Sequence, residues 1–112
     1  MEKNIIISIL YEYYKDLLTQ IQSDAIEQYY LEDLSLTEIA EQSGISKQAV
    51  SNNIKRAEAI LFDLEEKLGL YKRQSSFITS LETIDQLVKE KLSKSDYHLI
   101  HSKINQIIRE LS

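Results

Sequence analysis

The sequence predicts an all-α protein built around a helix-turn-helix. The chain of 112 residues contains no proline and two glycines, Gly44 and Gly69, so little in it interrupts helices. Apolar residues recur at three- and four-residue steps along most of the chain, as on the buried faces of helices. Between Ser35 and Leu61, a small residue, a glycine and an apolar residue have the spacing of two helices joined by a tight turn.

Two helices are expected before this motif. Thr19 and Gln22 have the spacing of a capping box, which separates a first helix over residues 4–18 from a second over residues 20–31. The face of the first should contain Ile6, Leu10, Tyr13 or Tyr14, Leu17 and Ile21. The second should bury, at least in part, Ala25, Ile26, Tyr29 and Tyr30.

The helix-turn-helix itself follows a short polar break at residues 32–34. Ser35 and Glu38 repeat the capping-box spacing, which predicts a short helix over residues 36–42. Gly44 stands where such a turn commonly needs positive φ, and Ser46 can cap the next helix. The residues expected to form the core of this motif are Ile39, Ala40, Ile45, Val50 and Ile54.

The second helix of the motif should be long. Apolar residues continue at steps of three and four up to Gly69, a stop signal, which gives about 22 residues and about 33 Å. Three short preceding helices are expected to cover its first half alone. The residues left in need of a second partner would be Leu61, Phe62, Leu64 and Leu68.

Residues 71–112 supply a candidate for that partner. One apolar stripe contains Phe77, Leu81, Ile84 and Val88. A second apolar stripe contains Tyr97, Ile100, Ile104, Ile107, Ile108 and Leu111. A polar break at residues 93–96 separates them, which predicts a helical hairpin. We expect a helix-turn-helix core over residues 1–70 and a hairpin over 71–112 that packs on the long helix. This packing would occur within one domain or across a homodimer, and a homodimer is expected.

Charge and composition restrict the function. The net charge is −5, but the charge is unevenly distributed. Residues 46–60 carry three basic side chains and one acidic side chain, whereas residues 1–45 carry two basic and nine acidic side chains. The absence of cysteine fits a cytoplasmic protein. Charged residues interrupt the apolar run near the N-terminus well before it could span a bilayer, so we expect neither membrane insertion nor a signal peptide.

The candidate nucleic-acid-binding surface lies at the start of the long helix. If Val50 and Ile54 face inward, the 100° step per residue turns Lys47, Gln48, Ser51, Asn52 and Lys55 toward solvent. Glutamine and asparagine can pair with adenine, and lysine can reach guanine or phosphate. Arg56 lies at the flank and suits a phosphate contact. The alternative is an ordinary polar helix surface, and three cations would give a salt slope of about −3, hence weak binding by a monomer.

No catalytic pattern is present, and neither an enzyme nor a cofactor is expected. The chain has no glycine-rich phosphate loop, no nucleophile elbow and no cysteine. His98 and His101, with Asp96 nearby, could in principle hold a metal, but such groups are usually plain polar surface, so no metal site is expected. The seven tyrosines fit helix packing better than base stacking.

The segment QYYLEDLSLTEIAEQSGISKQAVSNNIKRAEAIL resembles region 4 of sigma-70-type factors, and more closely the bacterial YlxM family. The resemblance covers about residues 5–70. It implies a sigma-70 region 4-like fold, within the winged-helix-like DNA-binding superfamily but without a clear wing. Length argues against a working sigma factor, because there is no room for the domains that bind polymerase and melt DNA.

The resemblance also implies a role in, or regulation of, the signal recognition particle pathway of protein targeting. Two hypotheses follow. The first is a regulatory helix-turn-helix protein linked to that pathway, with DNA or the particle's RNA or GTPase as partner. The alternative is a sequence-specific DNA-binding transcriptional regulator with no targeting role.

Overall fold

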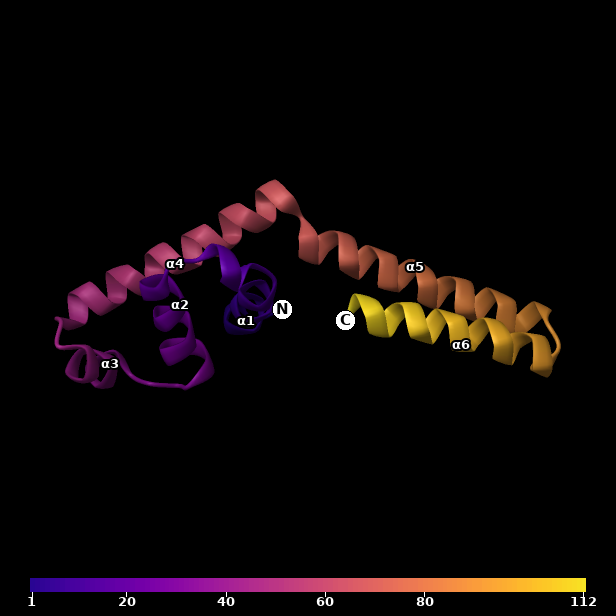
Figure 1. Ribbon diagram of the computed structural model, residues 1–112, viewed down its shortest axis with the longest axis horizontal. Coiled ribbons are helices and arrows are strands. Elements are labelled where there is room, and N and C mark those ends of the chain that lie inside the picture. Colours follow the sequence, from indigo (N-terminus) through magenta and orange to yellow (C-terminus); the bar gives the residue numbers. More distant parts are fainter. The chain divides into compact units, whose positions relative to one another are not determined.

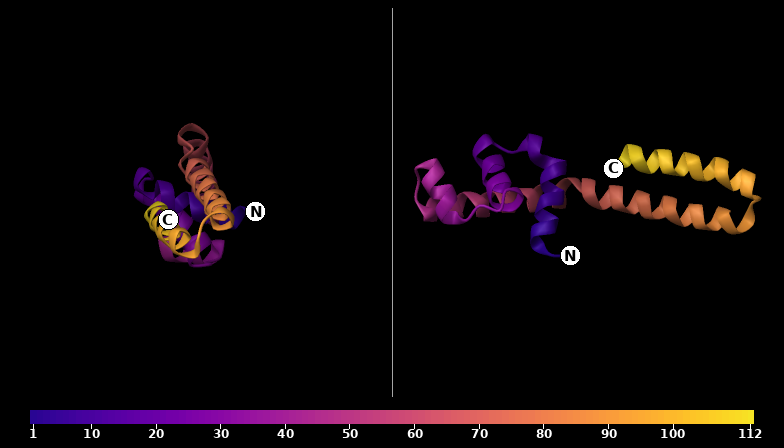
Figure 2. Two further views of the ribbon diagram at one scale, coloured as in Figure 1. Left: turned by 90° about the vertical axis from the view of Figure 1, so that its right-hand side faces the viewer. Right: turned by 90° about the horizontal axis from the view of Figure 1, so that it is seen from below.

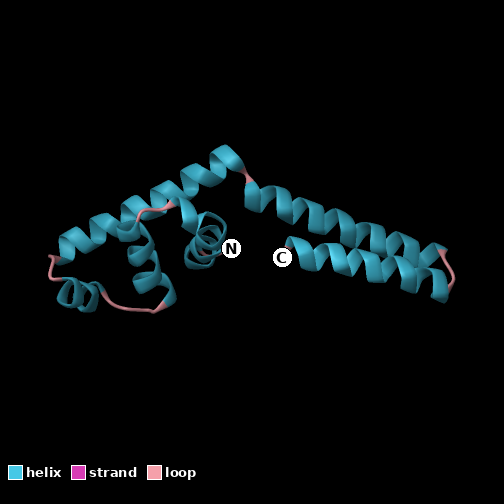
Figure 3. Ribbon diagram, viewed as in Figure 1, coloured by secondary structure: helices cyan, strands magenta, loops and turns pink.

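The computed structural model describes residues 1–112 and confirms the all-α prediction, because helices and short turns account for the whole chain (Figures 1 and 3). The helices are α1 Lys3–Tyr14, α2 Gln20–Ile26, α3 Leu36–Ser43, α4 Lys47–Leu68, α5 Leu70–Lys91 and α6 Lys94–Leu111. A 3₁₀ turn, Lys15–Leu17, follows α1, and a π-helical turn, Glu27–Leu31, follows α2. The chain divides into two compact units, Met1–Tyr71 and Lys72–Ser112, which are described separately.

The predicted helix caps are present. Thr19 and Ser35 each cap a helix in a complete capping box, with Gln22 and Glu38 as the returning side chains. Ser46 caps α4 by accepting from the main-chain N–H of Ala49 at 3.1 Å. Each such cap is worth about 1 kcal/mol. These local hydrogen bonds explain why the starts of α2, α3 and α4 could be predicted to within a residue.

The segment after α2 is less regular than predicted. The expected helix over residues 20–31 is α-helical to Ile26 and then widens into the π-helical turn, in which the Glu32 N–H donates to the Glu27 carbonyl at 2.8 Å. Asp33 has a φ of +55°, and the next amide, that of Leu34, donates to the Gln28 carbonyl at 2.9 Å. This left-handed residue ends the helix and leads the chain into α3.

Two apolar clusters hold the N-terminal unit together around α4. The first joins α1, α2 and the middle of α4 through Ile7, Leu10, Tyr11, Tyr14, Ile26, Ala57 and Leu61. The second joins α2, α3 and the first half of α4 through Ala25, Ile39, Val50 and Ile54. Val50, Ile54 and Ile39 therefore form the core of the helix-turn-helix as predicted, and Ala40 packs against them.

The predicted buried face of the first helix was right at Leu10 and Tyr14 and wrong at Leu17 and Ile21, while Ile6 and Tyr13 are partly buried against the first cluster. Ile7, Leu10, Tyr11 and Tyr14 are buried, whereas Leu17 and Ile21 are 60% and 65% exposed. The apolar run Ile5–Ile7 allows several phases, and the contact with α4 decides among them. The α-helix also ends at Tyr14, so the 3₁₀ turn carries Leu17 out of phase.

Two further core expectations need correction. Leu61 is fully buried and Leu64 packs on the first cluster, because α1 reaches beyond the first half of α4 and covers them. These two residues therefore do not need a second partner, although Phe62 and Leu68 remain 42% and 43% exposed. Ile45, expected in the core, is 42% exposed because it lies in the turn at the rim of a hollow.

The C-terminal unit is a helical hairpin of α5 and α6, as predicted (Figure 2). Ser93 begins α6 by accepting from the Asp96 N–H at 3.3 Å, within the predicted polar break. Ile104, at 5% exposure, is the one buried side chain of this unit. That the hairpin packs on α4 stays a prediction. No helix of the chain combines the length and apolar character needed to cross a bilayer.

Candidate nucleic-acid interface

The turn between α3 and α4 fixes where α4 begins. Gly44 has a φ of +70° and its N–H donates to the Ala40 carbonyl at 2.9 Å, which closes α3. A side chain is disfavoured in this left-handed conformation even though a Cβ at Gly44 would meet nothing within 4 Å. Two residues later Ser46 caps α4. The first two turns of α4 are thus held by a closed turn and by the second apolar cluster.

Five of the six candidate residues are exposed at this end of α4: Lys47, Gln48, Asn52, Lys55 and Arg56. The sixth, Ser51, is half-buried and lines a shallow hollow with Lys3, Tyr29 and Tyr30. The 100° step therefore predicted the outward face well, apart from Ser51, which lies where this face meets the π-helical turn. Gln48 and Asn52 are joined by a hydrogen bond from Nε2 to Oδ1 of 3.1 Å, which leaves the Gln48 oxygen and the Asn52 NH₂ group for a base edge.

The electrostatics of this face are more favourable to an anion than the net charge suggests. No acidic side chain lies in the first turn of α4, so nothing offsets the positive end of its dipole. No ion pair joins Lys47, Lys55 or Arg56 to a carboxylate. In contrast, the exposed side of α3 carries Glu38 and Glu41, and α3 has no basic residue, so it offers no cation to a phosphate backbone.

The one acidic residue of the 46–60 segment is turned inward. Glu58 forms an ion pair with Lys3, Nζ to Oε2 at 2.9 Å, and accepts a hydrogen bond from the Tyr30 hydroxyl. Its side chain is 13% exposed. Burial, together with the neighbouring Glu58 carboxylate, raises the pKa of Tyr30, so this hydroxyl stays protonated and donating. The arrangement removes a negative charge from the candidate surface.

Sequence reasoning missed this arrangement because its three residues are far apart in the chain. A tyrosine and a glutamate 28 positions apart give no periodic or motif signal. Two similar pairs link other helices: Tyr11 to Glu27, and Tyr14 to Glu65 at 2.6 Å. The tyrosines predicted to be packing residues are indeed half-buried or buried, except Tyr29, which is 37% exposed.

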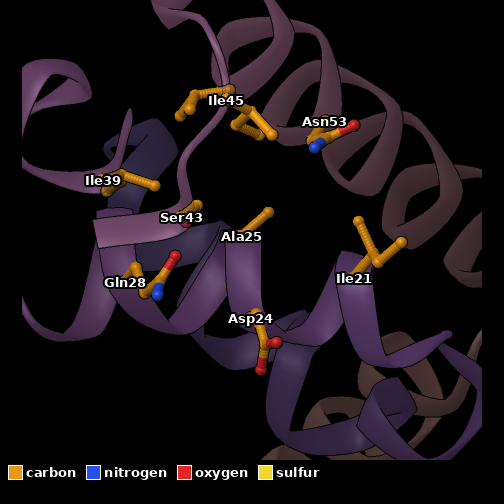
Figure 4. A pocket seen from close by; sticks show the side chains of 9 residues that line it. Ile21, Asp24, Ala25, Gln28, Ile39, Ser43, Ile45 and Asn53 are labelled. Atoms are coloured by element: carbon orange, nitrogen blue, oxygen red, sulfur yellow. The ribbon is translucent and has the colours of Figure 1, made fainter. Parts of the chain in front are cut away.

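A second feature that the sequence did not reveal is a hollow of about 330 Å³ beside the turn (Figure 4). Ile21, Ala25, Ile39, Ile45 and Val50 provide its apolar walls. Asp24, Gln28, Ser43 and Asn53 provide its polar groups. Ile21 and Ile45 both belong to this lining, and the open space of the hollow accounts for part of their exposure.

His101 takes part in a hydrogen-bond network inside the hairpin, whereas His98 does not. His101 Nδ1 lies 2.7 Å from Asp85 Oδ1, and the Tyr97 hydroxyl donates to Asp85 Oδ2 at 3.0 Å. Asn105 Nδ2 lies 3.0 Å from His101 Nε2. Both histidine nitrogens are thus occupied by partners within the hairpin. His98 is exposed and outside this network, and no cluster of three or more potential ligands gathers in the chain.

Comparison with known proteins agrees with this architecture. A family model described as "UPF0122: Putative helix-turn-helix protein, YlxM / p13 like" matches residues 1–106. A UPF0122 protein of Streptococcus pneumoniae serotype 19F is 45% identical over 97 residues, which is 87% of this chain and 84% of the relative. One from Oceanobacillus iheyensis is 42% identical over 107 residues, 96% of this chain and 95% of the relative.

A relative from Lactococcus lactis subsp. cremoris is 43% identical over 107 residues, 96% of this chain and 91% of the relative. The description of the family is that of a helix-turn-helix protein and not of an enzyme. The match extends from α1 through most of α6, so it includes the hairpin as well as the helix-turn-helix. The chain therefore belongs to the UPF0122 family of YlxM/p13-like helix-turn-helix proteins.

Proposed function

We propose that this chain is a regulatory protein that inserts the start of α4 into the major groove of duplex DNA. The observation that supports this most is the combination at one capped helix end of exposed Lys47, Lys55 and Arg56 with an inward-turned Glu58. Gln48 and Asn52 lie on the same face and provide the amide groups that read base edges. The three cations would position the helix on the phosphates.

The geometry favours DNA over an RNA duplex as the ligand of α4. The major groove of B-form DNA is about 12 Å wide and admits a helix. The major groove of A-form RNA is deep and too narrow for one, so α4 could touch an RNA duplex through phosphates alone. Base-specific contact by Gln48 and Asn52 therefore requires DNA or an irregular, opened RNA.

The expected affinity of one copy is low. Three phosphate contacts give a slope of about −3 in log K against log salt. The carboxylates of α3 reduce the affinity further. A homodimer would double the contacts and would match two half-sites about 34 Å apart if α4 of each copy entered successive major grooves.

The pathway that this protein would regulate is the signal recognition particle pathway in the cytoplasm, as the family resemblance implies. The alternative is a transcriptional regulator without any targeting role. Affinity purification of the tagged protein from its own host, with and without nuclease, separates them. Recovery of the particle's RNA or GTPase supports the first, and recovery of defined duplex DNA alone supports the second.

The DNA-binding step has its own test. Changing Lys47, Lys55 and Arg56 together to Glu should abolish binding to a random-sequence duplex in fluorescence anisotropy and remove the salt slope. The matched control changes Lys15, Lys89 and Lys94 to Glu, which alters the net charge equally but lies outside α3 and α4. If both triple variants lose binding equally, bulk charge and not α4 is responsible, and the proposal fails.

A further inference from the structure

The hairpin unit leaves much of its apolar surface uncovered. Among residues 72–112 one side chain, Ile104, is buried, and none is fully buried. A unit of this size rarely folds on so small a core without a disulfide, a metal or a partner. The large apolar residues that remain more than one-third exposed are Phe77, Ile84, Leu87, Leu92, Leu99, Ile100 and Ile107.

Most of this exposed apolar surface lies on one side of the hairpin. Phe77 and Ile84 are seven residues apart on α5, and Ile100 and Ile107 are seven apart on α6. Seven residues are close to two helical turns, so the members of each pair share one face of their own helix. The less exposed positions Leu81 and Val88 of α5, and Ile104 and Ile108 of α6, mark the sides where the two helices meet. Relative to those positions both pairs are rotated in the same sense, which in antiparallel helices puts them on the same side of the hairpin. We call this side, with Phe77, Ile84, Ile100 and Ile107, the apolar face.

The opposite side of the hairpin is polar. There Asp85 of α5 meets His101 and Asn105 of α6 in the hydrogen-bond network described above. The hairpin is therefore amphipathic as a unit, with α5 and α6 joined by polar bonds on one side and apolar on the other. A seven-residue apolar repeat is the pattern by which helices pack in four-helix bundles and coiled coils.

We propose that the apolar face packs against the same face of a second copy, so that two hairpins form a four-helix bundle with both turns at the same end. In this arrangement α5 of each copy lies beside α6 of the other and antiparallel to it. Phe77 and Ile84 then face the partner's α6 stripe. The proposal does not depend on what α4 binds.

The charges at the edge of the apolar face fit this pairing. Lys91 and Asp96 lie near the turn of the hairpin, and Glu110 lies near its open end. With the turns together, Lys91 meets Asp96 of the partner subunit. With the turns at opposite ends, α6 would lie beside α6 of the other copy, so Asp96 would meet Glu110 of the partner subunit and like charges would repel.

The area of the face is sufficient for a stable dimer. Helices of 18 and 22 residues are about 27 and 33 Å long, and two helices side by side are about 20 Å wide. Each copy would thus bury about 600 Å², or about 1,200 Å² in total, which lies at the lower end of the range for stable specific interfaces.

Light scattering on the full chain tests the proposal. The wild type should be a dimer at micromolar concentration, and Ile84→Lys with Ile107→Lys should make it monomeric. Because both side chains are exposed in the hairpin, the helix content measured by circular dichroism should not change.

The matched control is Leu99→Lys, at a 71% exposed position on the outer side of α6, which should leave the dimer intact. A monomeric wild type would mean that the N-terminal unit of the same chain covers the face, and a dimer unaffected by the double change would place the interface elsewhere. Either result overturns the proposal.

A mixing experiment tests the orientation. Lys91→Glu alone and Asp96→Lys alone each bring like charges together in a homodimer, and each should raise Kd about threefold to tenfold. Mixed in equal amounts, one of each chain restores two attractive pairs, Glu with Lys and Lys with Asp, so the dimer should recover. If the substitutions weakened the dimer through repulsion within a single hairpin, that repulsion would persist in the mixture and the dimer would not recover. If the mixture dimerises no better than either chain alone, the proposed orientation is wrong.

The triple variant at Lys47, Lys55 and Arg56 should remain dimeric. This result would separate the dimer inference from the proposed DNA-binding function.

Discussion

The hydroxyl group of Tyr14 joins three helices, and replacing Tyr14 by phenylalanine removes that group without leaving a cavity. The side chain is fully buried. Its hydroxyl donates to Glu65 Oε1 of α4 at 2.6 Å and accepts from the Leu70 N–H, at the start of α5, at 3.1 Å. The same Glu65 oxygen also accepts from the Tyr71 N–H at 3.1 Å, so one small network ties α1 to the end of α4.

The expected loss can be worked out from these contacts. A hydrogen bond to a charged acceptor contributes about 1.5–3 kcal/mol, and Leu70 is exposed enough for water to replace its lost partner. We therefore expect Tyr14→Phe to lower the free energy of unfolding of the N-terminal unit by about 2 kcal/mol. For a unit of this size, that corresponds to a decrease in Tm of about 8–16 °C.

Urea unfolding followed by circular dichroism at 222 nm measures this loss. The control is Tyr29→Phe, which removes the same atom from a tyrosine that is 37% exposed and makes no hydrogen bond through its hydroxyl. The control should change the free energy of unfolding by less than about 0.5 kcal/mol. Equal midpoints for the two variants would refute the view that the Tyr14 network stabilises the unit.

Three further changes test other parts of the structure. Gly44→Ala should cost about 1 kcal/mol in urea unfolding through strain at φ +70° alone, and Gly44→Asn should recover part of it; equal losses would disprove this cause. Leu61→Ala should cost about 2–5 kcal/mol, because α1 buries Leu61 completely; a loss typical of a surface site would show that α1 does not cover this part of α4. Hydrogen bonds from His101 and Tyr97 lower the pKa of Asp85, so its contribution to hairpin stability should be complete above the ordinary carboxyl pKa and be lost as pH falls through the lowered value. Melting curves between pH 2 and 6 should show this decline in the wild type and a weaker one in Asp85→Asn.

Sequence reasoning succeeded where structure depends on neighbours in the chain. The capping boxes at Thr19 and Ser35, the turn at Gly44 and the stop at Gly69 each rely on residues within four positions of one another. The outward face at the start of α4 follows from helical geometry once Val50 and Ile54 are buried. All of these could be predicted because no distant contact competes with them.

It failed where a contact between distant segments decides. The run Ile5–Ile7 gives α1 several equivalent apolar phases, and packing on α4 selects the one that buries Ile7. The inward position of Glu58 depends on Lys3 and Tyr30, which lie 55 and 28 residues away. The candidate surface was therefore predicted by residue type, but the reason for its local positive charge was not.

The π-helical turn between Glu27 and Leu31 affects how much variation in chain length this fold can accept. Each ring closed by its wider hydrogen bonds contains one residue more than the corresponding α-helical ring. A single-residue deletion within the turn would let it close as an ordinary α-helix while Ile26 and Leu34 keep their places in the two clusters. An inserted residue could not be absorbed by a change from π- to α-helical hydrogen bonding, so it would have to bulge out as a loop. Between α2 and α3, a chain one residue shorter is thus more compatible with this fold than a chain one residue longer.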